Sequence, residues 1–220
     1  MADIKVGRLT LGSFQTNCYY VYRESALNIT KEQGTLCPVL VFDPAESGAA
    51  IYEALKTKGF QVAAILLTHG HVDHIAGVKE LKECSGALVY ACDKEADLLS
   101  DMRDNLSMMF GTPLRVEADE LLQDGKEYVL GGMAFQMIAT PGHTAGSCTY
   151  YFKEADILIS GDTLFEGSVG RTDFPTGSMS VLVHSIKHKL FTLPEKTICY
   201  PGHGGTTTVG WEKDNNPFIV

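Results

Sequence analysis

The sequence "THGHVDH", from Thr68 to His74, places three histidines and an aspartate within seven residues, directly after the apolar run "AAILL". The apolar run predicts a buried strand, so the motif begins where that strand ends. Imidazoles two residues apart in an extended turn can bring two nitrogens to one metal ion, while Asp73 and His74, at the start of the following helix, suit a second ion. A histidine that serves only packing is usually single, so this cluster predicts a metal site.

Three further segments each place a potential metal ligand on a loop after a strand. In "TPGHTAGS" and "YPGHGG" a Pro-Gly pair turns the chain just before His143 and His203, and in "LISGDTLF" an apolar strand ends at Gly161 and is followed by Asp162. Loops at strand ends commonly carry functional side chains. Each segment is weak evidence alone, but together with "THGHVDH" they predict one site built from several strand ends.

The remaining pattern predicts an α/β fold with strands in two batches, each followed by helices, and hence two sheets packed face to face with helices outside. The segment from Glu24 to Gly34 is expected to be an exposed hairpin, and residues 101–113 are either a helix end or a loop. Strands are predicted at 5–12, 18–22, 39–42, 63–67, 87–91, 128–130, 133–139, 147–152, 156–160 and 197–200, and helices at 49–58, about 75–84, from about 94, and at about 179–190.

Composition limits the classes of protein. A chain of 220 residues that is 45% hydrophobic can bury one core, so a single domain over residues 1–220 is expected, and a charge of -9 argues against nucleic acid as a partner. The N-terminus lacks the apolar segment of a signal peptide, and polar residues interrupt the longest uncharged stretch, Tyr128 to Phe152, so no membrane association and a cytoplasmic location are expected. The six cysteines form no C-x-x-C pair and are expected to be reduced core thiols.

The order of the four motifs, from about Thr68 to Gly205, resembles the metallo-β-lactamase superfamily, and "LFEGSVGRTDFPTG" with the ending "NNPF" is similar to its short, single-domain glyoxalase II-like (hydroxyacylglutathione hydrolase-like) members. The family fold is an αββα sandwich, in agreement with the predicted elements. Full-length glyoxalase II enzymes add a C-terminal helical domain, which is not expected in residues 1–220.

The resemblance implies two divalent metal ions, zinc in the first place with iron or manganese as alternatives. It implies Asp162 as the ligand that bridges both ions, and Asp73 as both a ligand and a catalytic carboxylate. Asp43 would support the histidine loop without being a ligand, whereas the spacing of His184 and His188 favours a solvent-exposed helix face. The implied ligands are His69, His71 and His143 on metal one, and Asp73, His74 and His203 on metal two.

Such a site predicts hydrolysis of a small-molecule thioester, S-lactoylglutathione or a related compound. A water shared by two divalent ions loses a proton near neutral pH and can attack an acyl carbon, and a thiolate can leave without a protein general acid. Arg171 takes the place of a lysine that binds substrate in the family, or else forms an ion pair with Asp173. Met108, Met109 and Phe110 are either cleft wall or core.

Other functions are compatible with parts of the pattern. A mononuclear iron persulfide dioxygenase shares "GRTDF" and the first histidine motif, but needs only two histidines and a carboxylate. A β-lactam hydrolase and a non-enzymatic metal-binding module are weaker alternatives, the latter because no ligand of the motif set is missing.

Overall fold

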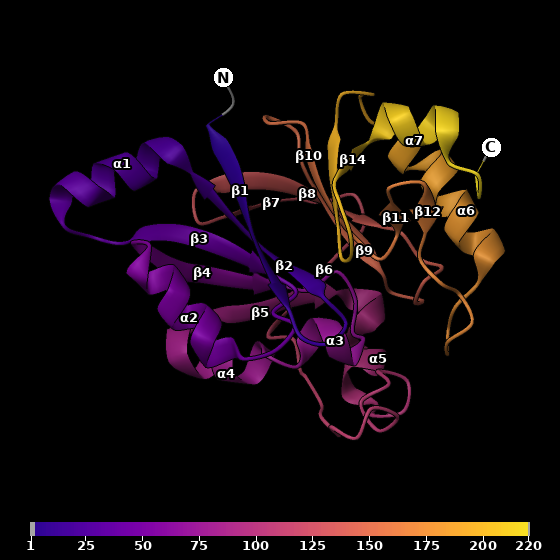
Figure 1. Ribbon diagram of the computed structural model, residues 1–220, viewed down its shortest axis with the longest axis horizontal. Helices are drawn as coiled ribbons and strands as arrows, with labels where there is room; N and C mark the ends of the chain where they lie inside the picture. Colours follow the sequence, from indigo (N-terminus) through magenta and orange to yellow (C-terminus); the bar gives the residue numbers. More distant parts are fainter. Residues whose placement is uncertain (1–2, 220) are drawn as a thin grey trace.

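The computed structural model describes residues 3–219, which form two six-stranded sheets packed face to face with helices on their outer faces (Figure 1). The predicted αββα sandwich is confirmed. None of the helices in residues 3–219 combines the length and the apolar character needed to cross a bilayer.

The first sheet holds the amino-terminal half of the chain. Its first two pairings are antiparallel and the following three are parallel. Because the parallel strands β3, β4 and β5 run the same way, the loops that follow them meet at one edge of the sheet. The strands lie in the order β1 (Ile4–Leu11), β2 (Thr16–Arg23), β3 (Cys37–Phe42), β4 (Phe60–Leu66), β5 (Leu88–Cys92) and β6 (Glu120–Leu122).

The second sheet holds the carboxyl-terminal half, and α6 (Met179–His188) and α7 (Val209–Asn215) lie on its outer side (Figure 1). Strand β10 pairs in parallel with β13, so the loops after these two strands also meet. The strands lie in the order β14 (Thr207–Thr208), β13 (Ile198–Pro201), β10 (Ile157–Gly161), β9 (Cys148–Phe152), β8 (Met133–Ala139) and β7 (Glu127–Leu130), and a short hairpin, β11 (Leu164–Phe165) and β12 (Ser168–Val169), follows β10.

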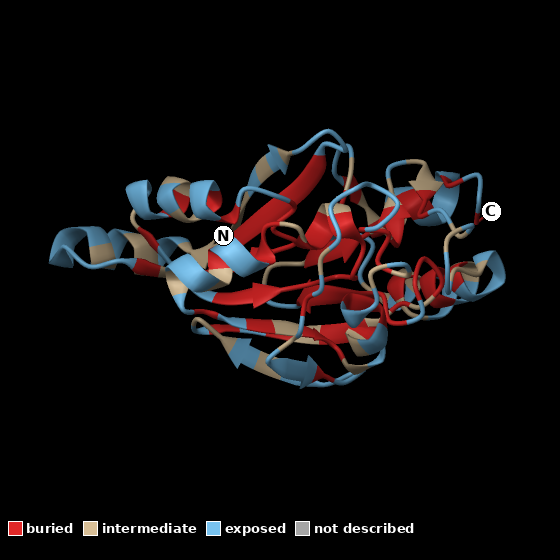
Figure 2. Ribbon diagram, turned by 90° about the horizontal axis from the view of Figure 1, so that it is seen from below, coloured by how far each residue is buried: buried red, intermediate tan, exposed pale blue. Residues whose placement is uncertain are grey.

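Successive side chains along each strand point to opposite faces of the sheet, and this alternation divides the core into layers. Tyr19, Phe42 and Tyr150 point between the two sheets, whereas Tyr20 and Val41, one position away, point outward beneath α2 (Gly48–Thr57) and α4 (Val78–Ser85). Figure 2 shows these buried strands between largely exposed helices. Burial on both faces gives the rigid frame that holds the loops at the strand ends in place.

Three expectations about local structure need correction. Glu24 to Gly34 is not a hairpin but a helix, α1 (Glu24–Gln33), which has no buried residue and ends at Gly34 in the left-handed conformation. The helix expected at 75–84 is broken into α3 (Val72–Ile75) and α4, because the Gly77 N–H donates to the Pro44 carbonyl at 2.8 Å and not to a carbonyl of the preceding turn. Cys84 is exposed, unlike the other five cysteines, although all six are free thiols.

The other predicted helices and strands are present with shifted ends. Residues 101–113 form turns after α5 (Ala96–Ser100), so this segment is a loop and not a helix end. Elements that the sequence pattern did not predict are β6, β14, the β11–β12 hairpin, α7 and the 3₁₀ turn η2 (Leu190–Thr192), whereas the 3₁₀ turn η1 (Asp93–Glu95) lies at the predicted start of the helix that continues as α5.

Candidate metal centre

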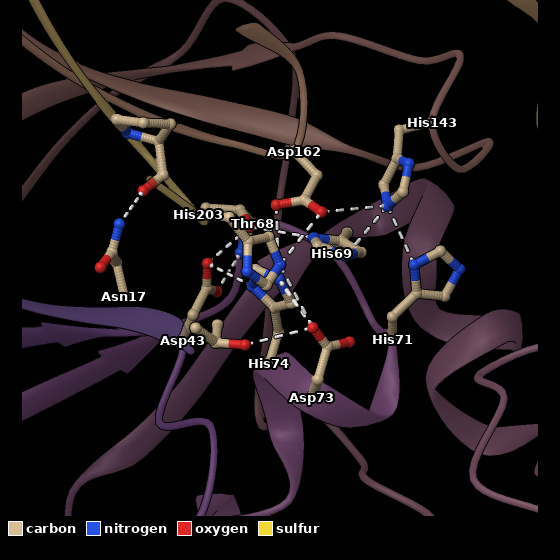
Figure 3. Close-up of polar contacts among 12 residues, drawn as sticks. Asn17, Asp43, Thr68, His69, His71, Asp73, His74, His143, Asp162 and His203 are labelled. Atoms are coloured by element: carbon tan, nitrogen blue, oxygen red, sulfur yellow. Dashed lines mark hydrogen bonds and ion pairs between the residues drawn. The ribbon is translucent and has the colours of Figure 1, made fainter. Parts of the chain in front are cut away.

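All seven predicted ligands lie together at one edge of the sandwich, although they range from His69 to His203 in sequence (Figure 3). They come from the loops after β4, β8, β10 and β13 and from the short helix α3. In three overlapping sets the nitrogen and oxygen atoms lie within 4.8 Å of one another: His69, His71 and His143; His69, His74 and Asp162; and Asp73, His74 and His203.

The hydrogen bonds around the first set direct ring lone pairs toward one another. His143 donates Nδ1–H to the Arg171 carbonyl at 2.7 Å, and Thr68, whose hydroxyl donates to Asp43 at 2.7 Å, accepts from His69 Nδ1 at 3.1 Å. These contacts assign the tautomers, so Nε2 of both rings carries a lone pair. The two Nε2 atoms lie 3.2 Å apart, and His71 Nδ1 lies 2.9 Å from His143 Nε2, so three ring nitrogens converge on one point where a shared cation would fit. Nitrogens on one zinc ion lie roughly 3.4 Å apart, close to this spacing.

The second set has the same construction. His74 donates Nδ1–H to Asp43 Oδ2 at 3.0 Å, and His203 donates Nδ1–H to the Phe14 carbonyl at 3.1 Å. The Nε2 atoms of both rings then face the Asp73 carboxylate, at 3.6 Å from His74 and 3.3 Å from His203. A lone pair against a carboxylate oxygen needs a proton or a metal ion between them.

Asp162 lies between the two sets. Its Oδ1 is 3.4 Å from His74 Nε2, and its Oδ2 is 3.6 Å from His203 Nε2 and 3.7 Å from His143 Nε2. Within residues 3–219, the buried atoms Asp162 Oδ1 and His74 Nε2 have no hydrogen-bond partner. Buried polar atoms are rarely left without a partner, so these residues fit a bound metal pair.

The pKa values of two histidines of the first set are lowered, and those of both histidines of the second set are raised. Burial, followed by the charge of neighbouring histidines, lowers the pKa of His69 well below its ordinary range and that of His71 to about 3. Burial also opposes the charged form of His74, but the carboxylates of Asp162, Asp73 and Asp43 outweigh it and raise the pKa of His74 well above its ordinary range. Burial lowers the pKa of His203, but the hydrogen bond to Asp73 and the charges of Asp162 and Asp73 together outweigh it, so this pKa is raised as well.

These directions predict that acid removes the second ion before the first. His74 and His203 hold protons to higher pH than an ordinary histidine, so a metal ion there must displace protons, and its affinity falls as the pH falls. His69 and His71 stay neutral, so protons compete only weakly with a metal ion for these two side chains. We expect dialysis at pH 5.5 to reduce bound metal from two ions to about one per chain, measured by elemental analysis against a sample held at pH 7.5. Loss of both ions at the same pH would contradict this assignment.

Asp43 holds the site together from the end of β3. It accepts from the Thr68 backbone N–H at 2.8 Å, and its other oxygen accepts from Thr68 Oγ1 and His74 Nδ1. The residue is 2% exposed and in the left-handed region with φ 49°. Asp43 therefore orients two of the rings without taking part in the three candidate sets, as the sequence suggested.

Replacing Asp43 by alanine should lower metal affinity by roughly 10- to 100-fold, because the His74 tautomer and the Thr68–His69 contact are no longer fixed. The measurement is a competitive titration with a metal chelator. Asp97→Ala, a change of the same size at an exposed position, is the control and should leave the affinity unchanged. An unchanged affinity in Asp43→Ala would show that the network does not orient the rings.

Glu95 is a site residue that the sequence reasoning missed. Its buried carboxylate accepts from the backbone N–H groups of Gly70 and Gly146 and from the Thr144 hydroxyl, at 2.8 to 2.9 Å. Burial raises the pKa of this carboxyl to about 7. Glu95 thus ties the His69–His71 loop to the His143 loop. No signal marked it, since an acidic residue at a helix start is usually solvated.

A cleft of about 340 Å³ opens over the candidate ligands, with His71, Asp73, His143, Asp162 and His203 in its floor. Its walls are apolar and are provided by the turn after β1, the 101–118 loop, the β11–β12 hairpin and the segment after it: Phe14, Leu106, Phe110, Phe165, Val169 and Phe174. Phe14 and Phe110 meet edge to face, with ring centroids 4.9 Å apart, across the mouth.

The structure resolves two open alternatives about the cleft. Of the segment Met108 to Phe110, only Phe110 lines it, and all three side chains are exposed and so are not core. Arg171 lines the cleft, but its guanidinium also forms two hydrogen bonds with Asp173, at 2.8 and 2.7 Å, and stacks on the Phe174 ring at 3.8 Å. The ion pair is therefore present and Arg171 also lines the cleft, while its role in binding substrate stays a prediction. His184 and His188 lie exposed on α6, as predicted.

The chain belongs to the metallo-β-lactamase superfamily, whose family model matches residues 12–203. It is 39% identical over 218 residues to the probable metallo-hydrolase YqgX of Bacillus subtilis, covering 98% of both chains. It is 30% identical over 213 residues to the hydroxyacylglutathione hydrolase GloC of Haemophilus influenzae, covering 94% of both.

Two crystal structures are similar over nearly the whole fold. The BLEG-1 B3 metallo-β-lactamase shares 37% identity at a TM-score of 0.89, covering 98% of this chain and 100% of that one. TTHA1623 in a di-iron-bound form shares 32% identity at a TM-score of 0.82, covering 97% of this chain and 100% of that one.

Proposed function

We propose that this protein is a dinuclear metal-dependent hydrolase that cleaves small thioesters, of which S-lactoylglutathione is the first candidate. One observation carries the proposal: His143 Nε2 lies 3.2 Å from His69 Nε2 and 2.9 Å from His71 Nδ1, so three ring nitrogens converge, and a second histidine-carboxylate set adjoins them. Similarity to a probable metallo-hydrolase and to a hydroxyacylglutathione hydrolase supports the same reaction class.

Two divalent ions held by these seven side chains would supply an activated water and a polarised acyl oxygen. The chain's own contribution is orientation. Asp43, the Arg171 carbonyl and the Phe14 carbonyl fix ring tautomers, and the phenylalanine walls surround the floor with apolar surface. We take zinc as the first candidate metal, with iron supported by the di-iron form of TTHA1623, and manganese as the third.

The chemistry of the cleft favours a thioester over an amide. Its ionisable lining consists of five candidate ligands and Arg171, so within residues 3–219 no lining carboxylic acid or histidine is left free to protonate a leaving group. An amide nitrogen needs such a proton, whereas a thiolate, whose conjugate acid has a pKa of about 8.5, does not. Asp73, which accepts from Thr16 Oγ1 at 3.2 Å, remains the candidate catalytic carboxylate at the edge of the second set.

β-Lactam hydrolysis is the second candidate, favoured by the similarity to BLEG-1. A persulfide dioxygenase would use one iron on two histidines and a carboxylate and would leave the second set without a role.

The test is turnover of S-lactoylglutathione, a penicillin and glutathione persulfide by the same purified sample, together with its metal content. The proposal predicts thioester hydrolysis with two ions bound and activity on several small thioesters, because the cleft is open and apolar. Oxygen consumption with one iron per chain, or penicillin turnover exceeding thioester turnover, would overturn it.

A further inference from the structure

A second recess adjoins the metal cleft on the far side of Phe14 and His203. It holds about 300 Å³, shares these two residues with the cleft, and is otherwise lined by residues of β1, the β1–β2 turn, β2 and the loop after β13: Arg8, Thr10, Gln15, Asn17 and Gly204. His203 contacts Phe14 through its Nδ1–H, so the boundary between the two spaces is fixed by the same bond that orients a candidate ligand. The two spaces meet at Phe14 and His203, so a molecule that extends from the metal site past these two residues enters the recess.

Arg8 gives the recess its charge. Its guanidinium donates one N–H to the Gly204 carbonyl at 3.2 Å and forms no ion pair with a carboxylate of residues 3–219, whereas Arg23 and Arg171 are both paired. Apart from this bond and its contact with the Tyr19 hydroxyl, the five donors of Arg8 have no partner in residues 3–219. The lining contains no acidic residue, although the chain as a whole carries a charge of -9. A free arginine in such a lining favours an anion.

The walls of the recess are held in place by hydrogen bonds between protein groups. Asn17, 2% exposed, donates from Nδ2 to the carbonyls of Pro201 at 2.9 Å and Gly204 at 3.0 Å (Figure 3 shows the first bond), and its Oδ1 accepts from Thr10 at 3.2 Å. These bonds connect β1 and β2 to the loop that carries His203. The recess is therefore built before any ligand enters, which lowers the cost of binding one.

We propose that the Arg8 recess binds a carboxylate of the thiol half of the thioester, and so selects thiols that carry a negative charge. The inference rests on the proposed function. The acyl half of a small hydroxyacyl thioester is only a few bonds long and stays over the metal floor, so the thiol half is the part that can reach past Phe14 and His203. Arg8 would then bind the carboxylate through its guanidinium fork, assisted by the Gln15 amide, which also lines the recess.

The test compares Arg8→Gln with Arg115→Gln, which removes the same charge at an exposed position beside α4. The substrates are S-lactoylglutathione, whose thiol half carries carboxylates, and S-lactoyl-N-acetylcysteamine, whose thiol half is neutral. We expect Arg8→Gln to lower kcat/KM for the first by about tenfold, mainly through KM, and to leave the second within twofold of the wild type. Arg115→Gln should change neither. An equal loss on both substrates, or no loss on either, would overturn the proposal.

A binding measurement separates this inference from the proposed function. S-methylglutathione is titrated calorimetrically into the metal-free protein, where its affinity does not depend on turnover. Weaker binding to Arg8→Gln than to the wild type by a similar factor supports the recess, and equal binding contradicts it. If the wild type hydrolyses neither thioester, the proposed function is wrong, while the calorimetric result still decides whether the recess takes a carboxylate.

Discussion

Replacing Asp162 by asparagine is expected to reduce thioester hydrolysis more than a thousandfold, a loss of about 4 kcal/mol of transition-state stabilisation. Asp162 is placed between the two candidate sets, with oxygens 3.4 Å from His74 and 3.7 Å from His143. Burial alone would raise its pKa, but the charges of His74, His143 and His203 lower it, so the carboxylate is ionised. Asparagine keeps the volume and loses the charge that would bind both ions.

The control for this variant lies at the other end of the same strand, β10. Asp156 lies directly before β10, and Asp162 lies directly after it. Asp156 forms an ion pair with Lys196, far from the candidate ligands. Asp156→Asn should retain activity within about twofold, since exposed ion pairs contribute little. Both variants are checked for folding by circular dichroism and for bound metal. Asp162→Asn with two ions and wild-type turnover would exclude a bridging role.

Gly202→Ala should disable the site without removing any candidate ligand. A Cβ at this position would overlap Asp162 Oδ1 and lie 2.6 Å from His74 Cε1. Because Asp162 and His74 are held by the packed ends of β10 and α3, the added methyl must displace them. We expect metal affinity to fall at least about 100-fold, with a corresponding loss of turnover at limiting metal.

Gly205→Ala is the matched control three residues along the same loop. The nearest atom to its added Cβ is the carboxylate end of Glu166 at 3.0 Å, which is exposed and free to move. Metal affinity in this variant should equal that of the wild type. If Gly202→Ala also binds metal normally, the loop after β13 is not packed as tightly around the ligands as the structure indicates.

The sequence indicated the fold and the candidate ligands because both depend on local, repeated signals. Apolar runs such as "AAILL" predict buried strands, and a ligand-type side chain after each strand end predicts a shared edge. Residues whose role is set by contacts distant in sequence could not be found in this way. Glu95 joins two loops through backbone N–H groups of Gly70 and Gly146, contacts that only the tertiary structure brings together.

Two other differences have physical causes of the same kind. The segment from Glu24 to Gly34 has too few apolar residues for helical periodicity to show, and α1 accordingly has no buried residue, with Ala26 and Leu27 only partly buried against the core. The neighbours of Arg171 in "GRTDF" are compatible with a position in the cleft and with an ion pair to Asp173. The side chain lines the cleft and forms the ion pair, because it is long enough to contact Asp173 and Phe174 at once.

The central claim is that the seven side chains hold two metal ions and that hydrolysis needs both. It is tested most directly by titrating metal-free protein with zinc while bound metal and S-lactoylglutathione turnover are measured in the same samples. The account predicts saturation at two ions per chain, with turnover remaining low until the second ion binds. Saturation at one ion with full turnover would contradict it.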